Sequence, residues 1–171
     1  MKPINLVCFS HGKESGPWGT KIKHLASIAK RLGFNVMSPD YSSEMNPNER
    51  VKMLLAKKPQ AINKLVLVGS SMGGYVSLVS SKELNPDGLF VLAPAVFLEG
   101  FEIQNPKPTA KIIEIVQGWN DVVVPTENVI SYANENKITL HLVDSDHRLT
   151  SELKNIGDIF EVFLKNVLKI S

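Results

Sequence analysis

Residues 64–76, KLVLVGSSMGGYV, predict a buried strand that turns within a few residues into a helix. The apolar run at residues 65–68 is typical of a strand in a parallel sheet that is covered on both faces. Residues 69–73, GSSMG, fit the pattern G-x-S-x-G, in which a serine sits on a sharp turn between a strand and a helix. Only Ser71 fits as that serine, because the preceding serine is not flanked by glycines at the required spacing.

The two glycines of this pattern have a steric role. In a turn tight enough to strain the backbone of the serine, the residues two before and two after it nearly touch, so that only glycine fits there. Ser71 would then lie on the crest of the turn at a helix N-terminus, with the amide of Met72 free to point at a developing oxyanion. The pattern therefore predicts a nucleophile. A turn rich in glycine and serine but without chemistry is the alternative.

Spacing disfavours two other glycine-rich turns. A phosphate-binding loop would need a lysine directly after its last glycine, and neither Gly73 nor Gly74 is followed by one. A dinucleotide-binding turn would need G-x-G-x-x-G, which does not occur in the chain. Nucleotide binding is therefore disfavoured.

Length and composition indicate an ordinary globular chain. The 171 residues, of which 43% are hydrophobic and 21% charged, predict a single domain over residues 1–171. The net charge of +2 comes from scattered lysines, so neither nucleic acid nor a membrane surface is indicated as a partner. No apolar run approaches the roughly 20 residues of a membrane-spanning helix.

The first apolar run, residues 4–9, is predicted to be a strand and not an export signal. Asn5 interrupts it, and polar residues follow it where an export signal would have small residues for cleavage. The single cysteine, Cys8, is expected to be a small buried hydrophobic residue. We therefore expect a cytoplasmic protein that is a monomer or a homodimer.

Hydrophobic periodicity predicts strands that alternate with helices. The strands are expected at residues 4–9, 34–37, 65–68, 89–92, 111–116 and 138–143. The first helix is expected to end near residue 32, and the next three to span residues 46–58, 72–83 and 126–134. A closing helix is expected from about residue 151 to the end. Asn46, Pro47 and Glu49 predict an N-cap, a first-turn proline and a capping glutamate.

This alternation predicts an α/β fold, a three-layer α/β/α sandwich with a mainly parallel six-stranded sheet. Ligands of such sheets bind beyond the carboxyl ends of the strands. We expect four loops that follow strands to converge at that edge: residues 10–16, 69–73, 118–124 and 145–148.

A serine hydroxyl needs a base to become a nucleophile, and His147 is the predicted general base. It lies in the polar loop at residues 144–148, which suits neither a core nor a regular element. A surface histidine beside acidic residues is the alternative for His147. Of the other histidines, His24 is interpreted as a solvated surface residue and His141 as part of a strand, whereas His11 precedes the serine in the chain.

The third member must orient the imidazole, and Asp121 in the loop at residues 118–125 is the predicted residue. The order Ser71, Asp121, His147 is the Ser…Asp…His order of one hydrolase class. Asp144 and Asp146 compete by proximity. Asp146 directly precedes the histidine, however, and adjacent side chains in extended backbone diverge.

The oxyanion would need a second donor besides the Met72 amide. The loop after the first strand can supply the amide of Lys13 or that of Gly12, although its glycines can equally serve only to turn the chain. In this interpretation His11 ties the loop by hydrogen bonds. Substrate binding or loop support is assigned to His11, Gly12, Ser70 and Trp119.

With these parts in place, the chain resembles the α/β-hydrolase superfamily, and more narrowly its small, lidless bacterial serine esterases of the YqiA-like type. The matching parts span nearly the whole chain: His11-Gly12, the turn at 69–73, Leu92-Ala93-Pro94-Ala95, residues 118–125 with Asp-x-x-x-Pro, and Asp146-His147. Compared with larger members, the chain lacks two strands before its first strand and lacks a helical cap.

The resemblance implies a single α/β-hydrolase domain over residues 1–171 in a minimal form of the fold with no cap domain. It implies a serine hydrolase that cleaves carboxylic esters or thioesters of small molecules through an acyl-enzyme on Ser71, with His147 and Asp121 as partners and with no metal or organic cofactor. The alternatives are a non-catalytic binding or partner-interaction protein on the same fold, and an acyltransferase or peptidase that uses the same residues.

Overall fold

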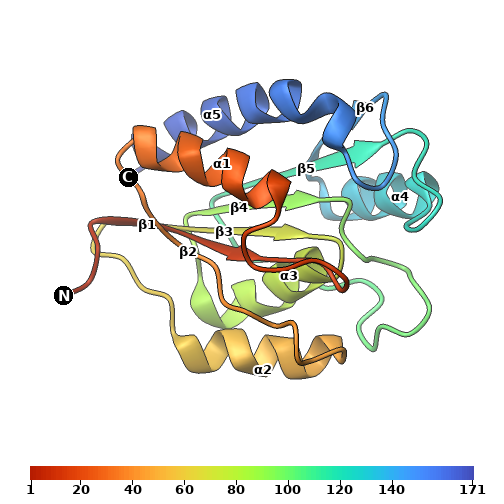
Figure 1. Ribbon diagram of the computed structural model, residues 1–171, viewed down its shortest axis with the longest axis horizontal. Helices are drawn as coiled ribbons and strands as arrows, with labels where there is room; N and C mark the ends of the chain where they lie inside the picture. The colour runs from red at the N-terminus through yellow and green to blue at the C-terminus, as the bar shows by residue number, and fades with distance from the viewer.

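Strands and helices alternate along the whole chain in the structure, a computed structural model that describes residues 1–171 (Figure 1). The strands are β1 (Asn5–Ser10), β2 (Asn35–Met37), β3 (Lys64–Ser70), β4 (Gly88–Leu92), β5 (Ile112–Gly118) and β6 (Thr139–Val143). The helices are α1 (Thr20–Arg31), α2 (Pro47–Lys57), α3 (Met72–Leu84), α4 (Thr126–Asn136) and α5 (Leu153–Lys169), the last preceded by a short 3-10 helix, Thr150–Glu152.

The six strands form one sheet in the order β2-β1-β3-β4-β5-β6, and every neighbouring pair is parallel. Helices α1 and α5 cover one face, whereas α2, α3 and α4 lie on the other (Figure 1). This arrangement confirms the predicted three-layer α/β/α sandwich. The sheet is parallel throughout, because every strand returns to the same edge through a crossover segment.

Each face of the sheet carries its own apolar core. On the side of α1 and α5, Phe90 of β4 packs against Phe160 and Phe163 with ring centroids 5.0 and 5.1 Å apart. The opposite core contains Tyr75 of α3 and the buried Cys8, whose thiol has its pKa raised to about 12 by burial. Cys8 is thus a buried hydrophobic residue, as predicted.

The interpretation of His24 as a solvated residue was wrong. His24 is half-buried, and its ring fills the space where a Cβ on Gly157 would stand, so the ring packs at the contact between α1 and α5. The lysines around His24 suggested an exposed position. Local composition does not reveal that Gly157, more than a hundred residues away in the chain, lacks a side chain and leaves room for the ring.

The start of α2 follows the predicted cap with one correction. Asn46 Oδ1 accepts hydrogen bonds from the amides of Asn48 and Glu49 at 2.8 and 3.2 Å, as an N-cap residue should. Glu49 is not the capping glutamate. The Asn46 amide instead donates to Glu44 Oε1 at 2.7 Å, and Glu49 pairs with Lys52.

The carboxyl edge of the sheet has no cap domain. Between β4 and β5, residues 93–111 form neither helix nor strand. This connection is too short to hold a multi-helix lid, so the loops that follow the strands define this end of the molecule. Elsewhere in the chain, no helix combines the length and the apolar character needed to cross a membrane.

Candidate active site

Ser71 occupies a strained turn between β3 and α3. Its backbone has φ 55° and ψ −117°, a conformation that residues other than glycine rarely adopt. A Cβ at Gly69 would collide with the carbonyl oxygen of Gly73, and a Cβ at Gly73 would collide with that of Ser10. The steric reason for the two glycines therefore holds in the structure.

The backbone of this turn is fixed by the end of the next strand. The Ser71 amide donates to the carbonyl oxygen of Leu92 at 2.9 Å, and the Ser71 carbonyl accepts from the Ala95 amide at 3.1 Å. Both bonds involve the backbone alone, so the hydroxyl of Ser71 is left for other partners.

The structure brings Ser71, His147 and Asp121 together, from the loops after β3, β6 and β5. His147 Nε2 lies 3.0 Å from Ser71 Oγ, and His147 Nδ1 lies 2.7 Å from Asp121 Oδ2. The imidazole with a proton on Nδ1 satisfies both contacts, since Nδ1–H donates to the carboxylate and Nε2 accepts from the hydroxyl. The Asp121 side chain is fully buried, whereas 21% of the His147 side chain is exposed.

Asp121 is held as a carboxylate by four donors. Its Oδ1 accepts from the amides of Val123 and Val124 at 2.9 and 2.8 Å, and its Oδ2 accepts from Gln117 as well as from His147. Burial alone would raise the pKa of Asp121, but the hydrogen bonds from His147 and the two amides outweigh it and lower the pKa below its usual value. Asp121 is therefore ionised where it faces the imidazole.

The two competing carboxylates have other partners. Asp144 Oδ1 accepts from the Asn120 side chain at 3.0 Å, and Asp146 Oδ1 accepts from the Arg148 amide at 2.9 Å. Neither is hydrogen-bonded to His147, which leaves Asp121 as its carboxylate partner.

Sequence reasoning missed Gln117, which lies inside β5 and is fully buried. Its Nε2 donates to Asp121 Oδ2 and to the carbonyl oxygen of Val124, both at 3.1 Å. Its Oε1 has no hydrogen-bond partner. The available signal was the position of Gln117 in the mostly apolar run IIEIVQG, because a buried side-chain amide needs hydrogen-bond acceptors inside the protein.

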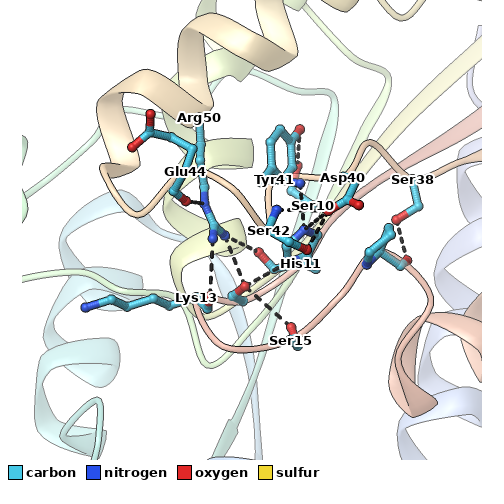
Figure 2. A network of polar contacts seen from close by, with 12 residues as sticks. Ser10, His11, Lys13, Ser15, Ser38, Asp40, Tyr41, Ser42, Glu44 and Arg50 are labelled. Carbon is cyan, nitrogen blue, oxygen red and sulfur yellow. Dashed lines mark hydrogen bonds and ion pairs between the residues drawn. The ribbon is translucent and has the colours of Figure 1, made fainter.

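His11 anchors the loop after β1 from inside the protein (Figure 2). The ring is fully buried, Nδ1–H donates to the Gly12 carbonyl oxygen at 2.8 Å, and Nε2 accepts from the Tyr41 amide at 2.9 Å. Burial lowers the pKa of His11, and the cation of Arg50 acts in the same direction. The ring is therefore neutral at neutral pH and bridges two segments.

The other predicted site residues lie around the turn. A Cβ on Gly12 would stand 3.8 Å from Ser71 Cβ and 3.6 Å from the Ser70 carbonyl oxygen, so the loop after β1 passes beside the serine. Met72 is the first residue of α3, where helical amides have no intrahelical acceptor. Trp119 is 55% exposed and begins the Asp121 loop. Their functional roles stay predictions.

The remaining histidine is engaged on the edge of the sheet. His141 Nε2 of β6 lies 2.6 Å from Glu114 Oε2 of the neighbouring β5. The structure contains no group of three or more histidine, cysteine, aspartate or glutamate side chains placed to hold a metal ion.

No protein-family model and no curated protein sequence matches this chain. Solved structures do match it. A proposed hydrolase of the alpha/beta superfamily from Xanthomonas campestris pv. campestris is 28% identical with a TM-score of 0.85, over 95% of this chain and 99% of that one.

Two more distant structures share the fold. A serine hydrolase without a lid, also from Xanthomonas campestris, is 19% identical with a TM-score of 0.74, over 100% of this chain and 85% of that one. Est1E from Butyrivibrio proteoclasticus is 15% identical with a TM-score of 0.79, over 99% and 90% of the two chains. With its parallel sheet, its strained serine turn and its uncapped edge, the chain has the fold of the α/β-hydrolases, in a small form without a cap domain.

Proposed function

We propose that this protein is a serine hydrolase that cleaves carboxylic esters or thioesters of small molecules through an acyl-enzyme on Ser71. The observation that carries the proposal is the continuous hydrogen-bonded series from Asp121 through His147 to Ser71 Oγ, with links of 2.7 and 3.0 Å. A buried carboxylate, an oriented imidazole and a hydroxyl on a strained turn are the parts that nucleophilic acyl transfer requires.

In the acylation step, Ser71 Oγ attacks the carbonyl carbon while its proton passes to His147 Nε2. Asp121 stabilises the imidazolium that forms and remains ionised itself. The tetrahedral intermediate carries its negative charge on the former carbonyl oxygen, which the amides of Met72 and Lys13 would receive. Collapse breaks the bond to the alcohol or thiol, which leaves with the proton from His147.

In the deacylation step, a water molecule takes the place of the leaving group. His147 Nε2 accepts a proton from that water as its oxygen attacks the acyl carbon, and then returns the proton to Ser71 Oγ. The products are the carboxylic acid and a regenerated serine. His147 Nε2 must therefore carry no proton at the start of each step, which is the state in which it accepts the hydrogen bond of the Ser71 hydroxyl.

The uncapped edge supports small substrates with short acyl groups. Residues 93–111 form no helix over the site, so little apolar surface is available to enclose a long chain. We therefore expect acetate and butyrate esters to be cleaved faster than octanoate esters. The cytoplasmic location stays a prediction from the sequence.

Hydrolysis of p-nitrophenyl acetate, butyrate and octanoate by the wild type and by Ser71→Ala tests the proposal, together with labelling by a fluorophosphonate probe. We expect turnover and labelling in the wild type and neither in the variant. A folded wild type that neither turns over nor labels would favour a binding protein. Labelling without hydrolysis would point to another acceptor, as in an acyltransferase, or to a peptidase.

A further inference from the structure

Arg50 of α2 is a charged side chain that the protein buries completely without a carboxylate partner. None of its side-chain area is exposed, and no ion pair involves it. Burial lowers the pKa of Arg50, but a guanidinium stays charged at every physiological pH. A buried cation is costly to keep, so its partners identify its role.

Those partners are backbone carbonyl oxygens, and three of them are consecutive in the loop after β1 (Figure 2). Arg50 Nη1 donates to His11 O at 3.2 Å and to Gly12 O at 3.0 Å, and Nη2 donates to Lys13 O at 3.2 Å. Nε donates to Glu44 O at 2.6 Å, which ties the guanidinium to the loop before its own helix. The planar fork of arginine can hold several acceptors in this way, whereas lysine cannot.

This pattern fixes the direction of the amides. In a trans peptide, the N–H of each residue points opposite to the C=O of the residue before it. Arg50 therefore turns the amides of Gly12, Lys13 and Glu14 away from itself. The Gly12–Lys13 peptide is fixed most firmly, because Gly12 O accepts from both Arg50 and His11 Nδ1.

The same peptide lies beside the nucleophile. A Cβ on Gly12 would stand 3.8 Å from Ser71 Cβ, so the backbone at Gly12 borders the space where a substrate carbonyl would meet Ser71. In Figure 2 the Lys13 side chain extends away from the network, which leaves its backbone as the part that faces the anchoring groups.

We propose that Arg50 is a positioning residue for the oxyanion site: it holds the Gly12–Lys13 peptide by its carbonyl side so that the Lys13 amide is presented to the oxyanion on the Ser71 side. The proposal rests on the proposed function. The positive charge on the carbonyl side also polarises the peptide, which strengthens the N–H as a donor. Packing of the guanidinium against Tyr41, 5.6 Å from its ring centroid, keeps the fork in place.

Arg50→Met tests the proposal, with Arg50→Lys as a milder variant and Lys64→Met as the matched control. Lys64 is likewise buried and donates to a backbone carbonyl, that of Ile170 at 2.6 Å, but it lies at the amino end of β3. Two readouts are needed: kcat and KM for p-nitrophenyl butyrate, and the amide order parameters of residues 12–14 from ¹⁵N relaxation.

We expect Arg50→Met to lower kcat by roughly 10- to 100-fold with KM changed less than threefold, since a misdirected oxyanion donor weakens only transition-state binding. The order parameters of residues 12–14 should fall from about 0.85 toward 0.6. Arg50→Lys should show an intermediate loss of kcat. Lys64→Met should keep the kcat and the rigid loop of the wild type.

Three outcomes overturn the proposal: a folded Arg50 variant with kcat within twofold of wild type, a loop that stays rigid in the variant, or an equal loss of kcat in Lys64→Met. If Arg50→Met does not fold, Arg50→Lys decides by the same criteria. A wild type without turnover refutes the proposed function instead, and the order parameters still decide whether Arg50 holds the loop.

Discussion

Gln117 Nε2 donates a hydrogen bond of 3.1 Å to Asp121 Oδ2, the same oxygen that lies 2.7 Å from His147 Nδ1. The buried amide thus fixes the carboxylate oxygen that orients the imidazole. Its other bond, to the Val124 carbonyl, ties the strand β5 to the loop that carries Asp121. The position of His147 is therefore set from inside the sheet as well as from its own loop.

Replacing Gln117 with methionine should lower activity and stability together. The variant keeps the volume of the side chain but removes both donated bonds, and we expect a stability loss of about 1–3 kcal/mol. Because Asp121 keeps its two amide donors, the expected fall in kcat/KM is on the order of tenfold. Urea unfolding and p-nitrophenyl butyrate hydrolysis measure the two effects. Gln60→Met, at an exposed position, is the control and should change neither.

The Ser71 turn should store strain that glycine relieves. With φ 55° and ψ −117°, the Ser71 backbone is held in a strained conformation that costs free energy of folding. The variants Ser71→Gly and Ser71→Ala both lack the nucleophile, so their comparison isolates the backbone. We expect Ser71→Gly to be more stable than Ser71→Ala by about 1 kcal/mol, because relief of strain exceeds the extra chain entropy of glycine. Equal unfolding midpoints in urea would argue against strain at this turn.

Gly73 should tolerate no side chain, whereas Gly16 should accept one. A Cβ at Gly73 would overlap the Ser10 carbonyl and stand 2.7 Å from His11 O, both of which are backbone and cannot rotate aside. Gly73→Ala should therefore lose at least about 1–3 kcal/mol of stability. Nothing lies within 4 Å of a Cβ at Gly16, so Gly16→Ala should stay within about 0.5 kcal/mol of wild type in thermal or urea unfolding.

Buried His11 should make stability depend on pH. Burial lowers its pKa in the folded protein, so the unfolded chain binds the proton more readily. Stability is then complete above the unfolded pKa of about 6.5 and is lost as the pH falls toward the folded pKa, by at most about 1.4 kcal/mol per pH unit. Protonation would also remove the acceptor for the Tyr41 amide, 2.9 Å away.

His11→Gln isolates this effect, because the glutamine oxygen can accept from the Tyr41 amide but does not titrate in this range. We expect urea unfolding at pH 8 and pH 5 to show a larger drop in stability for the wild type than for the variant. The exposed Asp40, 3.8 Å from His11 Nε2, opposes the shift and is present in both proteins. Equal drops would mean that His11 does not contribute.

The sequence predicted the fold and the Ser71 turn for local reasons. The spacing of apolar residues indicated the order of strands and helices. The observed bounds of these elements differ from the predicted ones by only a few residues. The glycines at positions 69 and 73 indicated a turn too tight for side chains two residues before and two residues after Ser71. The convergence of the loops followed from parallel topology, since the carboxyl ends of parallel strands share one edge.

Sequence patterns did not predict the side chains that orient the site, Arg50 and Gln117. Arg50 lies in α2 among polar and apolar residues, and its contacts with the loop after β1 join positions 37 to 39 residues apart. Gln117 was visible only as an odd polar residue in an apolar strand. Glu49 fitted the capping pattern, yet Glu44 makes the bond.

By itself the sequence determined the parallel α/β architecture and the serine turn, because backbone sterics and hydrophobic periodicity act between near neighbours. Only the tertiary structure decided which carboxylate faces His147 and which buried cation directs the loop after β1. These pairings join side chains and backbone groups that are far apart in the sequence. A buried charge or amide must be hydrogen-bonded for the chain to fold, and only the folded structure shows which polar groups lie close enough to pair with it.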